Sequence, residues 1–173
     1  PAGVDVQGYI SLIEKGLYSE AIKLIKEVNP LPAICGRVCV RPCEVACRRN
    51  LLDEGTGVGI DYMKRFAADV DLYSEGKYVP EIAPSTGKKV AIIGAGPGGL
   101  SAAYFLQQKG HQCDIYEAAP NPGGWLRYGI PEYRLPNDLL DKEVECITEI
   151  GANIYYNQKL GDNLHDKDLN RAY

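Results

Sequence analysis

The segment VAIIGAGPGGLSAA, residues 90–103, constrains the fold more than any other part of the chain. An apolar stretch leads directly into Gly94, Gly96 and Gly99, and a helical pattern follows. In a strand–loop–helix context the first glycine permits a tight turn, the second lets a pyrophosphate approach the backbone, and the third lets the helix pack closely on the strand. The segment therefore predicts the beginning of a Rossmann-like βαβ unit, with a dinucleotide at the helix N-terminus.

The residues around this loop continue the α/β pattern. We expect a strand over 89–93, a helix over 98–109, a strand over 112–117, a long loop over 118–136, a helix capped by Asn137, and a strand within 152–156. Glu117 ends the second strand, where a carboxylate can accept hydrogen bonds from a ribose hydroxyl. Its charge disfavours the 2′-phosphate of NADP at this position.

The long loop favours FAD over NAD as the dinucleotide. It reads PNPGGWLRYGIPEYRLP, in which Gly123, Gly124 and Gly129 allow the backbone to lie against a flat ring, whereas a typical NAD-binding fold proceeds to another helix at this point. The expected cofactor contacts are Gly94, Gly96, Pro97, Gly98, Gly99, Glu117, Gly123, Gly124, Trp125, Leu126, Arg127, Gly129 and Ile130.

Four cysteines, Cys35, Cys39, Cys43 and Cys47, follow one another at four-residue intervals. Because Pro42 is favoured at the first position of a helix, we expect the first two cysteines on a turn and the last two at the beginning of a helix. Helical residues four apart have Cβ atoms about 6 Å apart, whereas a disulfide needs about 3.8 Å. The spacing therefore favours metal ligation over a disulfide.

A [4Fe–4S] cluster fits this array, because its net negative charge would be offset by the helix N-terminus and by neighbouring arginines. These are Arg37, Arg41, Arg48 and Arg49. Two alternatives stay open, a structural zinc site and cysteines buried as small hydrophobic residues. The spacing differs from the ferredoxin pattern and by itself does not identify the metal. For Cys113 and Cys146 we expect ordinary core burial.

Three helical patterns surround the cysteines. Their apolar faces are Val6, Tyr9, Ile10 and Ile13, then Ala21, Ile22, Ile25 and Val28, and finally Ile60, Met63, Phe66, Ala67 and Val70. Gly16 is expected to end the first helix and Ser19 to cap the second. A stretch rich in Pro, Gly and Ser follows. We therefore predict a helical domain at 1–76, a linker at 77–88 and part of an α/β domain at 89–173.

Four motifs in this order, GRVC-x3-C-x3-C, KRFAAD, VAIIGAGPGGLSAA and PGGWLRYGIPEYRLP, resemble the small (beta) subunit of glutamate synthase and its relatives. This is a family of FAD- and iron–sulfur-dependent NAD(P)H oxidoreductases. It includes the amino-terminal part of dihydropyrimidine dehydrogenase and the large subunit of ferredoxin:NADP transhydrogenases. The resemblance covers essentially the whole chain. It implies a small helical iron–sulfur domain followed by the first part of a Rossmann-like FAD-binding domain, an α + α/β fold.

The resemblance also implies which residues hold the cofactors. Cys39, Cys43 and Cys47 would ligate a [4Fe–4S] cluster, with Cys35 as a further candidate, while other ligands would come from an upstream motif. Some relatives supply a Glu or Gln near the position of Lys64, and a charged lysine cannot ligate. In the family an NAD(P)H-binding domain interrupts the FAD domain, and residues 1–173 show no such domain. We therefore expect an amino-terminal fragment that is inactive alone.

The predicted function is an electron-transfer flavoprotein module that passes electrons between NAD(P)H, FAD and [4Fe–4S] clusters to a partner subunit or domain, as in glutamate synthase. The alternative is a non-catalytic, zinc-stapled interaction module with a degenerate nucleotide-binding fold. No catalytic residue is predicted, since His111 and His165 are expected to be solvated surface residues.

Composition excludes other classes of function. A net charge of −4 without a basic stripe argues against nucleic-acid binding. No apolar run approaches the ~18 residues of a membrane span, and the first residues lack the basic start and apolar core of a signal peptide. We therefore expect a cytoplasmic protein.

Overall fold

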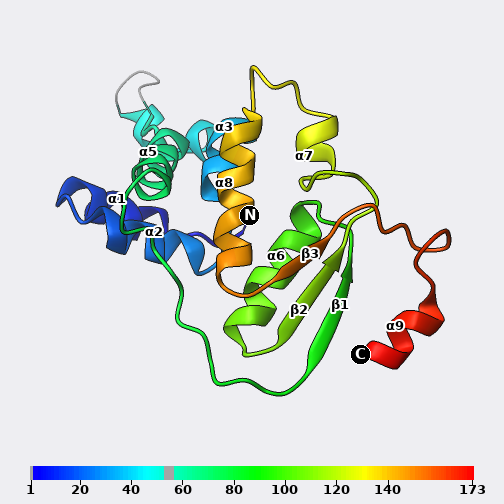
Figure 1. The fold of residues 1–173 in the computed structure, drawn as a ribbon. Helices are drawn as coiled ribbons and strands as arrows, with labels where there is room; N and C mark the ends of the chain where they lie inside the picture. The colour runs from blue at the N-terminus through cyan, green and yellow to red at the C-terminus, as the bar shows by residue number, and fades with distance from the viewer. Residues whose placement is uncertain (1, 53–56) are drawn as a thin grey trace. The chain divides into compact units, whose positions relative to one another are not determined.

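A computed structural model describes residues 2–52 and 57–173 (Figure 1). The chain separates into two compact units, residues 1–78 and 79–173. The first unit is helical and the second is a partial Rossmann-like domain with a three-stranded parallel sheet, which confirms the predicted fold class. In the described part of the chain, no helix combines the length and the apolar character that a membrane span requires.

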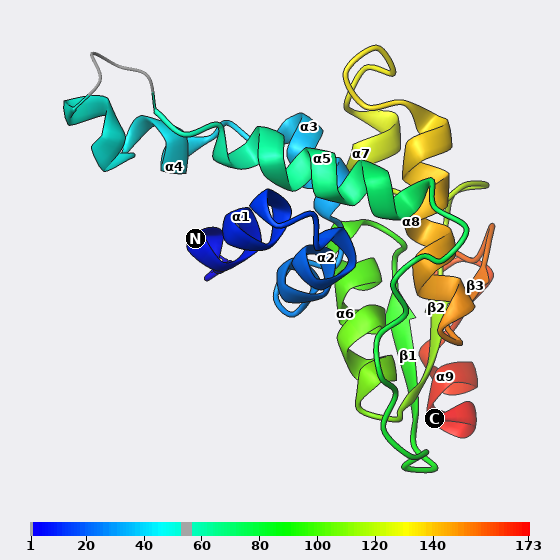
Figure 2. The same ribbon diagram turned by 90° about the vertical axis from the view of Figure 1, so that its left-hand side faces the viewer.

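The N-terminal unit is organised around its last helix. Its elements are α1 (Val6–Glu14), α2 (Tyr18–Lys26), α3 (Pro32–Val38), α4 (Pro42–Val45), a 3-10 helix η1 (Arg48–Leu51) and α5 (Ile60–Leu72). Helix α5 packs against α1, α2 and α3, and it runs along these helices in Figure 2. The side chains of Tyr9, Ile22, Ile25 and Ile34 are fully buried in the resulting core.

Sequence-local signals explain where the first two helices begin and end. Asp5 caps α1 by accepting a hydrogen bond from the Gly8 N–H at 2.8 Å. Gly16, at φ +74°, ends α1 as predicted, because its left-handed backbone lets the Leu17 N–H return to the Leu12 carbonyl. The predicted cap at Ser19 is wrong. The helix α2 already includes Ser19, and its N-cap residue is Leu17, which makes no side-chain cap.

The C-terminal unit contains β1 (Lys89–Ile93), α6 (Pro97–Gln108), β2 (Gln112–Tyr116), α7 (Trp125–Tyr128), α8 (Asn137–Glu149), β3 (Asn153–Tyr155) and α9 (Asp166–Ala172). The strands pair in the order β1-β2-β3, all parallel, with Ile92 opposite Ile115 and Ile115 opposite Ile154. Helix α6 packs on β1 and β2 and contacts α8. This is the arrangement that consecutive βαβ crossovers produce.

Several details of this unit differ from the predictions. Helix α8 begins at Asn137 with Pro136 in the N-cap position, so the predicted Asn137 cap is wrong by one residue. The long loop contains α7, and the polar C-terminal segment contains α9, with the exposed His165 at its N-cap. Cys113 is fully buried, as predicted, but Cys146 is only half-buried. His111 is half-buried, with its ring nitrogen 2.7 Å from the hydroxyl of Thr86.

Part of the segment predicted as a linker is fixed to the C-terminal unit. It contains no helix or strand, yet the Ala83 N–H donates to the Gln108 carbonyl and the Thr86 N–H donates to the Gly110 carbonyl, both at 2.9 Å. A Cβ on Gly110 would lie 2.2 Å from the carbonyl oxygen of Pro84. These bonds and this close approach hold the segment along the end of α6.

Gly98 and Gly99, the glycines in the first turn of α6, provide a test of the packing of this helix. A Cβ on Gly99 would lie 1.9 Å from the carbonyl oxygen of Gly94, whereas a Cβ on Gly98 meets no atom within 4 Å. Gly99→Ala should lower the free energy of unfolding by about 1–3 kcal/mol, because backbone must shift to admit the methyl group. Gly98→Ala should change it by less than about 1 kcal/mol. Urea denaturation of both variants measures the difference, and equal effects would contradict this packing.

Candidate functional site

The glycine loop combines a tight turn with close helix packing. Gly94 has φ +93°, a conformation that side chains disfavour, and its N–H donates to the Tyr116 carbonyl at 2.8 Å. The loop then enters α6, whose first residue is Pro97, a position where proline is favoured. Gly99 brings α6 against the loop, as the clash of its ideal Cβ with Gly94 indicates. The turn and the packing expected of this motif are both present.

Gly96 keeps the space in front of the loop open. The nearest atom to its ideal Cβ is the Cα of Gly124, at 3.9 Å, and no side chain caps α6. Gly98 is similarly open. An open surface without side chains at a helix N-terminus fits a diphosphate, which binds backbone N–H groups and gains from the helix dipole. The geometry of the loop therefore fits the pyrophosphate of a dinucleotide.

A second glycine loop lies directly against the first. Gly123 and Gly124 have φ values of +116° and +52°, and the Gly123 N–H donates to the Ala95 carbonyl at 2.8 Å. A Cβ on Gly124 would lie 3.0 Å from the Cα of Gly96. The two loops thus meet backbone to backbone, and glycine is required at the contact. We call the open surface that they form, from Gly94 to Gly99 and at Gly123 and Gly124, the glycine cradle.

Glu117 links the glycine loop to the turn after β2 through hydrogen bonds to its carboxylate. One carboxylate oxygen accepts a hydrogen bond from the Ala95 N–H at 2.7 Å and the other from the Ala119 N–H at 2.8 Å. The residue is only 8% exposed. Sequence analysis assigned this carboxylate to a ribose, and the structure shows a further role that the pattern did not suggest. Glu117 fixes the glycine loop to the turn after β2, and lone pairs remain on both oxygens for another donor.

The other predicted cofactor contacts are divided between the surface and the interior. Trp125 is 77% exposed, and its ring lies so close to Gly129 that a Cβ there would fall 2.3 Å from Cε2. Leu126 is buried, and Arg127 donates to the Pro122 carbonyl at 2.7 Å and contacts Asp141. Arg127 thereby fixes α7 to α8. Pro97 is exposed and Ile130 is half-buried. The structure brings Gly94–Gly99, Gly123, Gly124 and Glu117 together, whereas Leu126 and Arg127 serve the packing of α7.

Sequence analysis missed Ala95, the residue that links the parts of the cradle. Its N–H binds Glu117, its carbonyl accepts from Gly123, and its methyl group is fully buried. The available signal was its size, because only a small residue fits between Gly94 and Gly96 at a buried position.

The cysteine array adopts a different local structure from the predicted one. Cys35 lies within α3 and Cys39 is its C-cap, so the prediction that both lie on a turn is wrong. The reason is Pro32, which begins α3 in the favoured first position. Cys43 lies in α4 as predicted, but α4 is only one turn long, and Cys47 falls beyond it as the N-cap of η1.

The four cysteines are not joined by disulfides, and each is half-buried. The Cys39 Sγ accepts a hydrogen bond from the Arg41 N–H at 3.3 Å, and the Cys35 Sγ lies 3.5 Å from the side-chain oxygen of Asn29. Hydrogen bonds from the backbone of Val58 and then Arg49 lower the pKa of the Cys47 thiol. Donors directed at sulfur stabilise thiolates, the form that ligates metals. Donors reach the sulfurs of Cys39 and Cys47, which fits cluster ligation by these residues, whereas the Cys35 thiol itself donates to the Asn29 oxygen.

The arrangement of the sulfurs does not match a site for a single ion. Within residues 2–52 and 57–173, no group of three or more His, Cys, Asp or Glu side chains is placed to hold one metal ion. The thiols of a cluster are distributed over several irons, so they lie farther apart than the ligands of one zinc ion. The cysteines of this chain form an array along α3, α4 and η1, and they are not a preformed tetrahedral site.

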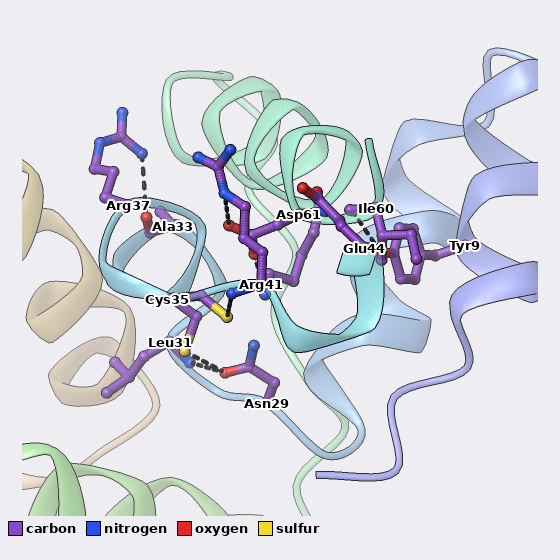
Figure 3. A network of polar contacts seen from close by, with 12 residues as sticks. Tyr9, Asn29, Leu31, Ala33, Cys35, Arg37, Arg41, Glu44, Ile60 and Asp61 are labelled. Atoms are coloured by element: carbon purple, nitrogen blue, oxygen red, sulfur yellow. Dashed lines mark hydrogen bonds and ion pairs between the residues drawn. The ribbon is translucent and has the colours of Figure 1, made fainter. Parts of the chain in front are cut away.

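A polar network fixes the turn that carries Cys39 and Cys43 (Figure 3). Arg41 reaches the buried Asp61 carboxylate, with Nε 3.4 Å from Oδ2, and Lys64 approaches its other oxygen at 2.6 Å. The Glu44 carboxylate accepts the Asp61 N–H at 2.8 Å, and the Tyr9 hydroxyl donates to the Ile60 carbonyl at 2.7 Å. Burial above all raises the pKa of Tyr9, and the nearby Cys43 and Asp61 add to the shift.

Two of the arginines predicted to offset a cluster's charge already have carboxylate partners. Arg37 makes two parallel hydrogen bonds with Asp69, at 2.8 and 3.1 Å, and Arg41 pairs with Asp61. Their charges are therefore largely neutralised by the protein itself. Arg48 is exposed in η1 beside Cys47. Lys64, whose charge rules it out as a ligand, is occupied by Asp61.

Two family models match parts of the chain. Residues 1–75 match the family described as dihydropyrimidine dehydrogenase domain II, 4Fe-4S cluster, and residues 92–163 match the family described as NAD(P)-binding Rossmann-like domain. The first match covers all four cysteines of the array, and the second covers the glycine cradle.

Curated relatives are similar over the whole chain. It is 38% identical to the NADPH-Fe(3+) oxidoreductase subunit beta of Geobacter sulfurreducens, of which it covers 26%. It is 40% identical to the NADP(+)-dependent formate dehydrogenase subunit beta of Moorella thermoacetica, covering 27%, and 39% identical to the NAD-dependent dihydropyrimidine dehydrogenase subunit PreT of Salmonella typhimurium, covering 42%. In each case the alignment includes 100% of this chain. The chain thus spans about a quarter to two fifths of these relatives.

The chain therefore combines a domain of the 4Fe–4S type with a Rossmann-like nucleotide-binding domain. Over its whole length it is similar to the three subunits of NADPH-, NADP(+)- and NAD-linked enzymes named above.

The role of Glu117 in the cradle leads to a prediction that needs no cofactor. Glu117→Gln replaces one acceptor oxygen by an NH₂ group, which then faces a backbone N–H in a buried position. The free energy of unfolding of the chain should fall by about 1–3 kcal/mol, because a buried donor loses its acceptor. The control Glu132→Gln, at an exposed position, should have no measurable effect. Denaturation of the cofactor-free chain tests this, and a Glu117→Gln variant as stable as the control would contradict it.

Proposed function

We propose that this chain is the electron-transfer module of an FAD- and iron–sulfur-dependent NAD(P)H oxidoreductase. The observation that carries the proposal is the presence, in one chain, of an open glycine cradle and a cysteine array of the 4Fe–4S type. Neither feature alone supports this function. A flavin accepts two electrons as hydride and releases them singly, which is the conversion needed between NAD(P)H and iron–sulfur clusters.

FAD rather than NAD is proposed for the cradle. The second loop contacts the first at Gly124 and Gly96, and the backbone continues through α7 to Gly129, with an exposed Trp125 beside it. Glycine backbone at Gly123 and Gly124 beside an exposed aromatic ring suits a flat ring beyond the pyrophosphate. Residues Gly94–Gly99 would hold the pyrophosphate, Glu117 the ribose, and the segment 123–130 would lie beside the ring, with Leu126 and Arg127 holding that segment in place. NAD(P)H would be bound by a domain outside residues 1–173.

The cysteine array would hold a [4Fe–4S] cluster through Cys39, Cys43 and Cys47, with Cys35 as a further ligand candidate, and other ligands would lie outside this chain. The protein's own contribution is to orient the thiols and supply backbone donors to them, as the Arg41 N–H does for Cys39. Such donors tune the reduction potential of a cluster.

The partner is proposed to be an electron-accepting subunit or domain in the cytoplasm. The three relatives described above are named as subunits, of an Fe(3+) oxidoreductase, a formate dehydrogenase and a dihydropyrimidine dehydrogenase. Glutamate synthase, suggested by the sequence motifs, is a further candidate reaction. The module would be common to these reactions, and the acceptor would be determined by the partner.

The proposal predicts the colour and the redox behaviour of the full-length protein. Purified without oxygen, it should be brown, should contain iron, acid-labile sulfide and FAD, and should bleach on addition of NADH or NADPH. Residues 1–173 alone should not oxidise either nucleotide, because hydride transfer requires reacting atoms about 3–3.5 Å apart and the donor site lies elsewhere. Stoichiometric zinc with no flavin, iron or sulfide would contradict the proposal and indicate a non-catalytic interaction module.

The proposed role of the glycine cradle in binding FAD can be tested by filling its open space with a side chain. Gly96→Val places a branched side chain in the open space in front of the loop, where the pyrophosphate is proposed to bind. FAD affinity of the full-length protein should fall at least about tenfold, equivalent to about 1.4 kcal/mol. Gly76→Val is the matched control, since a Cβ there meets no atom within 4 Å and lies outside the cradle. FAD content measured after gel filtration decides the outcome, and unchanged content in Gly96→Val would exclude this binding mode.

A further inference from the structure

The turn between Cys39 and Cys43 is held in an unfavourable backbone conformation. Arg41 has φ 58° and ψ 47°, the left-handed helical region. Among the described residues, Asn157 is the other non-glycine residue with positive φ, and asparagine tolerates this region whereas arginine does not. Pro42 follows directly and favours an extended conformation for the residue before it. Local preferences therefore oppose this turn, so other contacts must hold it.

Two neighbouring residues in the first turn of α5 supply these contacts. The Nε atom of Arg41 lies 3.4 Å from the Oδ2 atom of Asp61, a carboxylate that is 1% exposed. The guanidinium carbon of Arg41 lies 3.9 Å from the centroid of the Tyr62 ring, a stacking distance. The ion pair with Asp61 and the stacking on the Tyr62 ring together fix the position of the Arg41 side chain. We call this set, Arg41, Asp61 and Tyr62, the arginine clamp.

The clamp is attached to the cysteines by short connections. The backbone N–H of Arg41 donates to the Cys39 Sγ at 3.3 Å, and Arg41 is the N-cap of α4, two residues before Cys43. Glu44, the residue after Cys43, accepts the N–H of Asp61 at 2.8 Å. The first turn of α5 therefore contacts both sides of Cys43. Lys64 lies 2.6 Å from the other oxygen of Asp61, so this carboxylate has a second cationic neighbour besides Arg41.

We infer that the arginine clamp is a positioning device for the cysteine array: Asp61 and Tyr62 hold Arg41 in its left-handed turn, and this turn places Cys39 and Cys43 for a common cluster. The inference rests on the proposed function for the cluster itself. The clamp residues are positioning residues, since none of them supplies a sulfur or an oxygen to the metal. Their effect is on the backbone between two ligands and on the hydrogen bond to Cys39.

Two substitutions at Arg41 distinguish the effect of losing the left-handed turn from the effect of losing the positive charge. Arg41→Ala removes the clamp and leaves a residue that avoids the left-handed region, whereas Arg41→Gly removes the same charge but accepts the turn. Asp61→Asn and Tyr62→Leu weaken the clamp from the side of α5. Lys23→Ala, on the exposed surface of α2, removes a positive charge elsewhere in the unit and is the control.

The rate of hydrogen–deuterium exchange at the backbone amides of residues 39–47, in the metal-free, full-length protein, measures how easily the turn opens. Exchange should become about tenfold faster in Arg41→Ala and Asp61→Asn, as local opening becomes easier, and Tyr62→Leu should show a smaller increase. Arg41→Gly should remain closer to the wild type than Arg41→Ala, and Lys23→Ala should not change. Faster exchange in Arg41→Gly than in Arg41→Ala, or no change in either Arg41→Ala or Asp61→Asn, would overturn the inference.

Cluster content and the electron paramagnetic resonance spectrum of the reduced, reconstituted protein provide the second measurement. Arg41→Ala and Asp61→Asn should bind several-fold less iron and sulfide or show an altered spectrum, with partial recovery in Arg41→Gly. Normal clusters in all three variants would overturn the positioning role. If the wild type takes up no iron or sulfide, the proposed function fails instead, and the exchange measurement still decides whether the clamp holds the turn.

Discussion

Buried carboxylates organise both units of this protein, because a carboxylate removed from water must be matched by donors close to it. In the C-terminal unit Glu117 takes its donors from the backbone of two loops, and it thereby shapes the glycine cradle. Asp114 takes its donors from the side chains of Asn153 and Tyr173, which tie β2 to β3 and to the end of α9. The donors of a single carboxylate thus connect segments that are distant in the sequence.

In the N-terminal unit three acidic residues of α5 each hold a different segment. Asp71 pairs with Lys26 of α2 at 3.3 Å, Asp69 pairs with Arg37 of α3, and Asp61 pairs with Arg41 in the cysteine turn. Such pairs contribute modestly to net stability, because desolvation offsets much of the attraction, but for the buried Asp61 and Asp71 the loss of the partner leaves a costly buried charge. Their effect is to fix the register of the cysteine segments against α5. The helix without cysteines therefore determines how the cysteines are presented.

The sequence predicted the elements well where local signals agreed with each other. The strand Lys89–Ile93, the following helix and the tight turn at Gly94 agree with the prediction, because an apolar run, glycine spacing and helix pattern all indicate the same structure. Predictions failed where a local signal was ambiguous or absent. Pro32 and Pro42 both mark helix beginnings, and only Pro42 was interpreted in that way, so Cys35 was placed on a turn and not within α3. Helix α9, in a polar segment, lacked an apolar periodic signal.

By itself, the sequence determined the class of each unit, the glycine positions of the dinucleotide loop and the four cysteines, since these depend on short-range geometry and residue chemistry. Only the tertiary structure decided which distant residues complete the sites. The contact of Gly124 with Gly96, the bond from Ala95 to Glu117 and the clamp on Arg41 each join residues separated by twenty or more positions. No local pattern specifies such contacts, because they arise when packing brings donors and acceptors together in a buried place, where each polar group must find a partner.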